Sequence, residues 1–347
     1  MTAARLGQIH GDPSVVWGSS GTPSINVYSQ NRNATTSTFV KLSGTVPTPA
    51  GGYVTSNSCS PDGNFLAVVT ADSPWMYIYQ RDGDKFTLLT GIAAPTTSGN
   101  ALWVAWSPDG QYFSVALTAS PYIATYKRSG STFSKIANPG TAISGGARCL
   151  AWSPSGRTIA IGLSVTPFIN IYNFDPATDT YTKLSNPATL PTFAFQVSWS
   201  NDGTRLAIGH NASPWFRHYQ RSGDTFTAGT ISGTGPGSNS FVDFNPDGTQ
   251  LIVGSSTAPR LYMYNVSGST ATNAGLTIVG SNPTSNVNGG IAWDSKGEYL
   301  AVGIFLTPFT ALYSKTANTA TVVRLQNPNT LPPNNTNSIP GWWPTRY

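Results

Sequence analysis

Few residues of this chain have the types and spacing that acid–base or metal chemistry needs. Its three histidines are His10, His210 and His218, and only the last two fall in one stretch, on neighbouring predicted strands. A catalytic or metal-binding pair would need a third group. Only Asp202 and Asp224 lie near in sequence. We therefore expect the histidines to have structural roles.

Other signatures of catalysis or cofactor binding do not occur. There is no Gly-x-Ser-x-Gly motif, no phosphate-binding loop and no Cys/His metal spacing. Cys59 is expected in the core, with no disulfide to Cys149, and the Asp-Gly turns are too short to supply the six oxygens that Ca²⁺ takes. The sequence thus predicts no metal, no cofactor and no enzymatic activity. A site assembled from several repeats around a channel would, however, leave no local motif.

Aromatic residues recur at a position that could bind sugars or proteins. Seven times a proline is followed five residues later by a tyrosine, and the residue directly after this proline is aromatic in five copies. The candidate binding-face aromatics are Trp75, Tyr122, Phe168, Trp215 and Phe309, while Ser24 and Arg260 occupy the other copies. Such side chains are favoured at binding hot spots. The alternative is that they pack between neighbouring sheets.

These residues are carried by a repeat that spans almost the whole sequence. Its marker is a turn such as Ser107-Pro108-Asp109-Gly110, flanked by two apolar runs. The turn glycines are Gly63, Gly110, Gly156, Gly203, Gly248 and Gly297, with spacings of 47, 46, 47, 45 and 49 residues. Pro and Gly suit the second and last positions of such turns, so the pair of runs predicts a hairpin. With the proline-to-tyrosine strand and a fourth strand, each repeat predicts a four-stranded antiparallel meander.

Repeats of this length indicate a propeller, because one such sheet cannot bury both of its faces alone. The first repeat lacks its opening strand, and the tail over 331–347 resembles the missing piece. We therefore predict one domain over 1–347, an all-β seven-bladed β-propeller of four-stranded antiparallel blades. Strands from both termini are expected to close the ring, with the tail completing the first blade.

Composition limits the partners. The formal charge is +5, only 10% of residues are charged, and no basic run indicates nucleic-acid binding. The first residues lack the apolar core of a secretion signal, and no run of 18 apolar residues exists, so no membrane insertion is expected.

The Ser-Pro-Asp-Gly turn followed by Leu-Ala-Ile-Gly resembles the pattern of WD-repeat-like propellers, although the Trp-Asp and Gly-His dipeptides of true WD repeats are missing. The stretches 73–86 and 213–226 also resemble propeller proteins of tailed-bacteriophage virions. This resemblance implies a non-enzymatic interaction scaffold in a phage tail or capsid, assembled in the host cytoplasm, with other virion proteins as partners. The alternative is a carbohydrate-binding propeller that attaches to a host-surface glycan through the aromatics.

Overall fold

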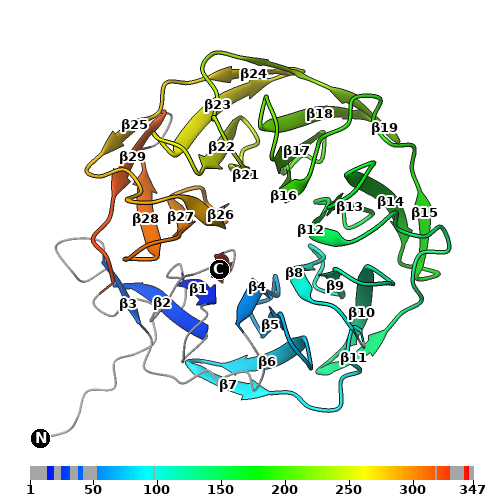
Figure 1. The fold of residues 1–347 in the computed structure, drawn as a ribbon. Helices are drawn as coiled ribbons and strands as arrows, with labels where there is room; N and C mark the ends of the chain where they lie inside the picture. The colour runs from blue at the N-terminus through cyan, green and yellow to red at the C-terminus, as the bar shows by residue number, and fades with distance from the viewer. Residues whose placement is uncertain are drawn as a thin grey trace, which may run out of the picture.

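Each full repeat forms one radial sheet in the computed structural model, which describes residues 14–18, 25–31, 38–41, 53–96, 98–316, 319–328 and 340–343. The regular elements of these ranges are all strands, and their sheets stand as blades around a central channel (Figure 1). The prediction of an all-β propeller is confirmed. Within the described ranges, no helix is long and apolar enough to cross a membrane.

Six blades are each built from one continuous stretch of chain, with antiparallel neighbours from the channel outward. The first three consist of β4 (Val54–Cys59), β5 (Phe65–Thr70), β6 (Met76–Asp82) and β7 (Lys85–Leu88); β8 (Ala101–Trp106), β9 (Tyr112–Leu117), β10 (Ile123–Ser129) and β11 (Thr132–Lys135); and β12 (Ala147–Trp152), β13 (Thr158–Leu163), β14 (Ile169–Asp175) and β15 (Thr180–Lys183). The next three consist of β16 (Ala194–Trp199), β17 (Arg205–His210), β18 (Phe216–Ser222) and β19 (Thr225–Ala228); β21 (Ser240–Phe244), β22 (Gln250–Ser255), β23 (Leu261–Ser267) and β24 (Thr270–Asn273); and β26 (Val287–Trp293), β27 (Tyr299–Ile304), β28 (Thr310–Lys315) and β29 (Thr321–Arg324).

Two of these blades carry a fifth strand that the repeat pattern did not predict. β20 (Thr230–Ser232) runs parallel to the outer strand β24, and β25 (Thr277–Val279) runs parallel to β29. Each comes from the linker that leaves the preceding blade, so the linker covers the outer edge of the next blade. The other continuous blades have the four antiparallel strands that the sequence predicted.

A further sheet combines strands from both ends of the chain. It consists of β1 (Ser14–Gly18), β2 (Ile25–Asn31), β3 (Thr38–Lys41) and β30 (Gly341–Trp343). β30 pairs antiparallel with β1, with Val15 opposite Trp342, and lies beside the channel (Figure 1). The predicted number of seven blades is therefore reached only when this mixed sheet is counted, because six blades are continuous in sequence. Of the predicted tail, 331–339 and 344–347 lie outside the described residues.

The repeated turn is closed by its own side chains. Ser107 Oγ donates to Asp109 Oδ1 at 2.6 Å and accepts the N–H of Tyr112 at 2.9 Å. The same carboxylate oxygen accepts the N–H of Gln111. Gly110 has φ +67°, a conformation that glycine adopts without a side-chain penalty. These bonds fix the hairpin that joins the inner strand to the second strand.

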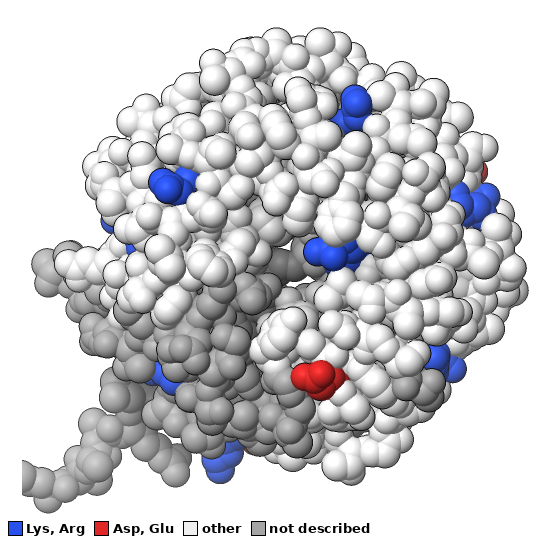
Figure 2. Space-filling model, viewed as in Figure 1, with Lys and Arg blue, Asp and Glu red and all other residues white. Residues whose placement is uncertain are grey.

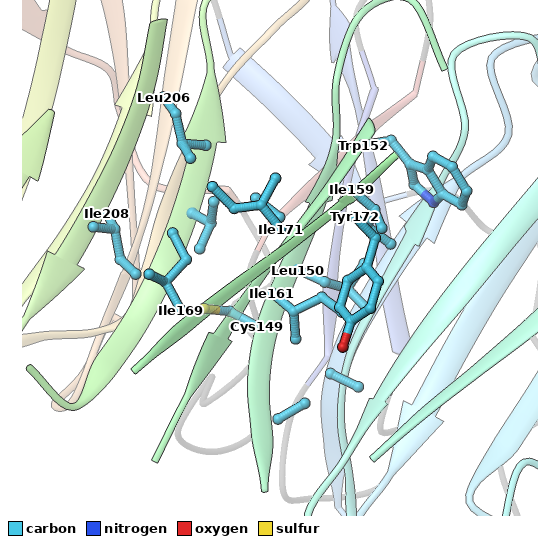
Figure 3. Close-up of a cluster of buried hydrophobic side chains, with 14 of the residues drawn as sticks. Cys149, Leu150, Trp152, Ile159, Ile161, Ile169, Ile171, Tyr172, Leu206 and Ile208 are labelled. Carbon is cyan, nitrogen blue, oxygen red and sulfur yellow. The ribbon is translucent and has the colours of Figure 1, made fainter. Parts of the chain in front are cut away.

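The hydrophobic core lies between the blades. Figure 3 shows both faces of one blade: Cys149, Ile169 and Ile171 lie on the side of Leu206 and Ile208 of β17, whereas Trp152, Ile159 and Tyr172 lie on the other side. The repeated tyrosine in each third strand is fully buried there. In five blades its hydroxyl donates to a carbonyl of the linker from the preceding blade, as from Tyr126 to the Ala93 carbonyl at 2.7 Å. Neighbouring blades are thus joined by apolar contact and, at five linkers, by one tyrosine hydrogen bond.

Candidate functional site

One end of the channel widens into a pocket of about 480 Å³. Its walls come from the first residues of the inner strands and from the turns between second and third strands, which contribute Ser256 and Phe305. A space-filling view of one face shows Lys or Arg atoms at the edge of the central opening, on a surface with few charged side chains (Figure 2). The residues that line the pocket come from several blades.

The pocket exists because the inner strands are irregular at one shared level. The pairing of β4, β8, β12 and β16 with their second strands shifts by one residue near the start of each inner strand. The residues skipped by these shifts are Thr55, Leu102, Arg148 and Phe195, and all four line the pocket. A β-bulge re-aims a side chain in this way, so the same irregularity in four blades builds one site.

Arg148 is the one charged side chain among the described residues that line this pocket. Its Nε donates to the Ala194 carbonyl of the next blade at 3.1 Å, and its guanidinium lies 4.3 Å from the ring centre of Phe193. No carboxylate of the described residues pairs with it. Burial lowers the pKa of the Arg148 guanidinium, which nevertheless stays charged because arginine is not deprotonated in proteins.

The other lining residues include buried aromatic side chains, partly exposed aromatic side chains at the rim, and asparagines. Trp103 and Phe241 are buried, whereas Tyr53 and Phe305 at the rim are 41% and 50% exposed. Asparagine side chains also line the pocket, at positions 239, 286 and 288. A cation, amide groups and ring faces together suit a small anionic molecule with hydroxyl groups.

Beyond this pocket the channel continues into a second chamber of about 570 Å³, which opens toward the Ser-Pro-Asp-Gly turns. Asp243 lines it and links three blades. Its Oδ1 accepts the Ser198 hydroxyl at 2.7 Å, and its Oδ2 accepts the Trp293 N–H at 2.9 Å. Burial raises the pKa of this carboxyl to about 7, so it changes charge near neutral pH.

The predicted aromatics lie on the face that holds the pocket. Trp75, Tyr122, Phe168, Trp215 and Phe309 all have positive φ, from 63° to 75°, and half-buried side chains. Arg260 in the sixth turn shares this conformation, and Ser24 lies outside the described residues. Trp75 packs on one interblade core cluster and Tyr122 on another. Contact between blades and partial exposure to solvent are therefore combined at Trp75 and Tyr122.

The histidines that the structure describes are buried away from the pocket. His210 Nδ1 lies 3.0 Å from the Thr192 hydroxyl, and His218 Nε2 lies 3.1 Å from the Thr230 carbonyl. Burial lowers the pKa of each to about 4, so both are neutral at physiological pH. His10 lies outside the described residues. Cys59 and Cys149 are buried free thiols. Within the described ranges, no cluster of three His, Cys, Asp or Glu side chains could hold a metal ion.

Sequence reasoning missed Arg148 and the asparagines. One signal was present: Arg148 is a charged residue inside the otherwise apolar run from Ala147 to Trp152. Strict alternation would place it on the interblade face with Leu150, where an unpaired charge is costly. A bulge that turns this side chain toward the channel removes the conflict.

The fold is shared with several solved structures. A protein from Bacteroides uniformis, provisionally named a 6-phosphogluconolactonase, has a TM-score of 0.72 at 16% identity, covering 90% of this chain and 95% of that one. The periplasmic gluconolactonase of Pseudomonas aeruginosa has a TM-score of 0.71 at 12% identity, covering 97% and 100%. Hydrazine synthase of Kuenenia stuttgartiensis has a TM-score of 0.60 at 14% identity, covering 87% and 95%. No protein-family model and no curated protein sequence matches the chain.

These similarities correct the functional expectations from the sequence. The comparisons contradict both the expected non-enzymatic phage scaffold and the expected lack of enzymatic activity, because proteins named as gluconolactonases share this fold over nearly their whole length and none of the structures named above comes from a phage. The stretches 73–86 and 213–226 that carried the resemblance form the third strand of a blade with the turns on either side of it, which propellers of many functions need. At 12–16% identity the comparisons establish the fold alone. The expected partners and virion location stay predictions.

Proposed function

We propose that the chain binds a sugar acid or its lactone in the Arg148 pocket and hydrolyses the lactone. The observation that carries this proposal is Arg148 itself, a guanidinium turned into an aromatic-walled pocket by a β-bulge and unpaired with any described carboxylate. The names of the similar structures support the same ligand class.

The pocket has groups suited to the charge changes of lactone hydrolysis. When water adds to a lactone carbonyl, negative charge develops on its oxygen, and N–H donors fixed in a partly dry site stabilise that charge. Arg148 supplies such donors. The described residues that line the pocket include no carboxylate and no histidine. We therefore expect rate enhancement to come from electrostatic stabilisation by Arg148.

The first test is binding of gluconate by calorimetry, with glucose as the uncharged comparison. Arg148→Gln should weaken gluconate binding by about 10- to 100-fold, since a charge-assisted hydrogen bond contributes roughly 1.5–3 kcal/mol. The matched control is Arg157→Gln, which removes the same charge from an arginine that is mostly exposed at a turn on the opposite face. The rate of glucono-δ-lactone hydrolysis above the spontaneous rate should fall in Arg148→Gln and stay unchanged in the control. Equal binding of gluconate by both variants would contradict the proposal.

We also propose that the turn aromatics extend the sugar-contacting surface around this pocket. The supporting observation is that five aromatic side chains are half-exposed on the pocket's face. Rings of this kind stack on sugar faces. Trp75→Ala combined with Trp215→Ala should abolish signals on a glycan array, and no change in those signals would show that both rings serve only blade packing.

A further inference from the structure

The inner strand β26 is more irregular at the level of the pocket than the other inner strands. Its pairing with β27 shifts so that three residues, Asn288, Gly289 and Gly290, face Gly303 alone. The shifts in β4, β8, β12 and β16 each insert one extra residue, whereas this one inserts two. We call residues 288–290 the glycine bulge. Asn288 and Gly289 line the pocket, so the bulge forms part of its wall.

Gly303 makes room for the glycine bulge. A Cβ atom at position 303 would lie 2.7 Å from the Cα atom of Gly289 and 2.9 Å from its carbonyl carbon. Two carbon atoms pack best at about 3.5–4.0 Å, so any side chain at 303 would push the bulge away. The corresponding residue of β9 is Ala116, which faces Trp103 beside a bulge of only one extra residue. The larger bulge of β26 therefore requires glycine at 303.

The glycine bulge brings backbone groups to the pocket. β26 is the terminal strand of its sheet, so β27 is its one hydrogen-bonded neighbour there. Three bulge residues carry more N–H and C=O groups than Gly303 can pair, which leaves some of them for partners outside the sheet. Gly290 has φ +82°, a conformation outside the regular strand that favours glycine. Gly289 has no side chain to cover its peptide groups, so a ligand can approach them closely.

The residue after the bulge shows what this edge of β26 can bind. The Ile291 N–H donates to Oε1 of Gln196 at 3.3 Å, and the Ile291 carbonyl accepts Nε2 of the same side chain at 2.8 Å. Gln196 belongs to β16, so both bonds are made from the channel side. The channel edge of β26 thus binds a group that donates and accepts at once. Hydroxyl groups have the same capacity.

The glycine bulge and Arg148 come from opposite sides of the channel. β26 and β12 face each other across it, and the inner strands β16 and β21 lie between them on one side (Figure 1). The bulge residues carry no charge, whereas Arg148 is a cation. A carboxylate therefore belongs at Arg148, and the uncharged hydroxyl groups of the same molecule belong at the bulge.

We propose that the glycine bulge is the hydroxyl-binding subsite of the Arg148 pocket. Its peptide groups and the Asn288 side chain bind hydroxyl groups of the sugar acid whose carboxylate Arg148 binds. Gly303 is the positioning residue that keeps the bulge in place, since it does not itself line the pocket. This inference rests on the proposed function. The subsite recognises polyhydroxy acids and takes no part in the chemical step.

The test compares calorimetric affinities for gluconate and hexanoate, two six-carbon acids of which only gluconate carries hydroxyl groups beyond the carboxylate. Gly303→Ala should weaken gluconate binding about tenfold and hexanoate binding less than twofold, because the shifted bulge loses only hydroxyl contacts. Arg148→Gln should weaken the binding of both acids. The control is Gly140→Ala, because a Cβ atom at this exposed position meets nothing within 4 Å.

A second variant covers the case in which Gly303→Ala does not fold. Deletion of Gly290 reduces the bulge to the one extra residue of β8 and should change the two affinities in the same unequal way.

The possible outcomes separate the subsite from the pocket. Equal losses for both acids in these variants, or an unchanged gluconate affinity, would overturn the subsite alone as long as Arg148→Gln still weakens gluconate binding. Failure of the wild-type chain to bind gluconate would overturn the proposed function and the inference with it.

Discussion

At the scale of single residues, Arg148 and Asp243 show how burial acts differently on the two charges of the channel. Burial disfavours both charged forms, but arginine has so high a pKa that Arg148 remains a cation. Asp243 starts from an ordinary carboxyl pKa, and burial raises it to about 7. The pocket end of the channel is therefore positive at any physiological pH, whereas the charge of the chamber end depends on pH.

This difference gives a prediction for stability. Because the pKa of Asp243 is raised in the folded state, its contribution is fully present below the unfolded pKa near 3.8 and is lost as pH rises through about 7. The contribution of Asp243 to the free energy of unfolding should therefore fall between pH 4 and pH 7 by on the order of a few kcal/mol. His210 and His218, whose pKa values burial lowers to about 4, act in the opposite direction over the same range. Asp294, which lines the same chamber, has its pKa raised by burial and acts in the same direction.

Urea denaturation across this pH range measures the effect. Asp243→Asn keeps the size of the side chain and removes its titration, so the free energy of unfolding of the variant should rise relative to that of the wild type as the pH increases from 4 to 7. Asp224→Asn, at a turn on the opposite side from the pocket, serves as the control. The same slope in all three proteins would show that Asp243 keeps an ordinary pKa.

At the scale of elements, the blades could be predicted and the pocket could not. Turn glycines such as Gly110 and Gly156 need positive φ, and their spacing marked each hairpin directly. The pocket depends on bulges, and a bulge shifts register without a fixed residue type. The skipped residues Thr55, Leu102 and Phe195 have nothing in common by which sequence could mark them. Arg148 was the one informative exception, and Gln196 acts across 95 residues of sequence.

The repeated tyrosines give a prediction at this scale. Tyr126→Phe keeps the buried ring but removes the hydroxyl that bonds the Ala93 carbonyl of the linker. A buried carbonyl left without its donor costs about 1–3 kcal/mol. Urea denaturation should show this loss for Tyr126→Phe and a change below about 0.5 kcal/mol for Tyr122→Phe, whose ring is half-exposed. A neutral Tyr126→Phe would mean that the linker is held by packing alone.

At the scale of the whole molecule, the continuous blades need a closing element. Six blades built from one stretch leave two end faces apolar, and the sheet of β1–β3 with β30 lies between β4 and β26 at this gap (Figure 1). β1 and β30 pair over three positions, Ser14 with Trp343, Val15 with Trp342 and Val16 with Gly341. Few residues thus join the two ends of the chain, and the mixed sheet covers the faces of the two blades that border the gap.

Removal of β30 tests whether this pairing closes the ring. A chain ending at residue 339 should unfold at a lower temperature and associate into dimers or larger species, because β1 then becomes a free edge beside the channel. A chain ending at residue 343 keeps β30 and is the matched control. Light scattering and thermal denaturation compare the two. The pocket is lined by residues of the blades that begin with β4, β8, β12, β16, β21 and β26. Gluconate binding should therefore weaken only if the loss of β30 moves these blades apart. A shorter chain that stays monomeric with an unchanged melting temperature would show that β1–β3 closes the ring without β30.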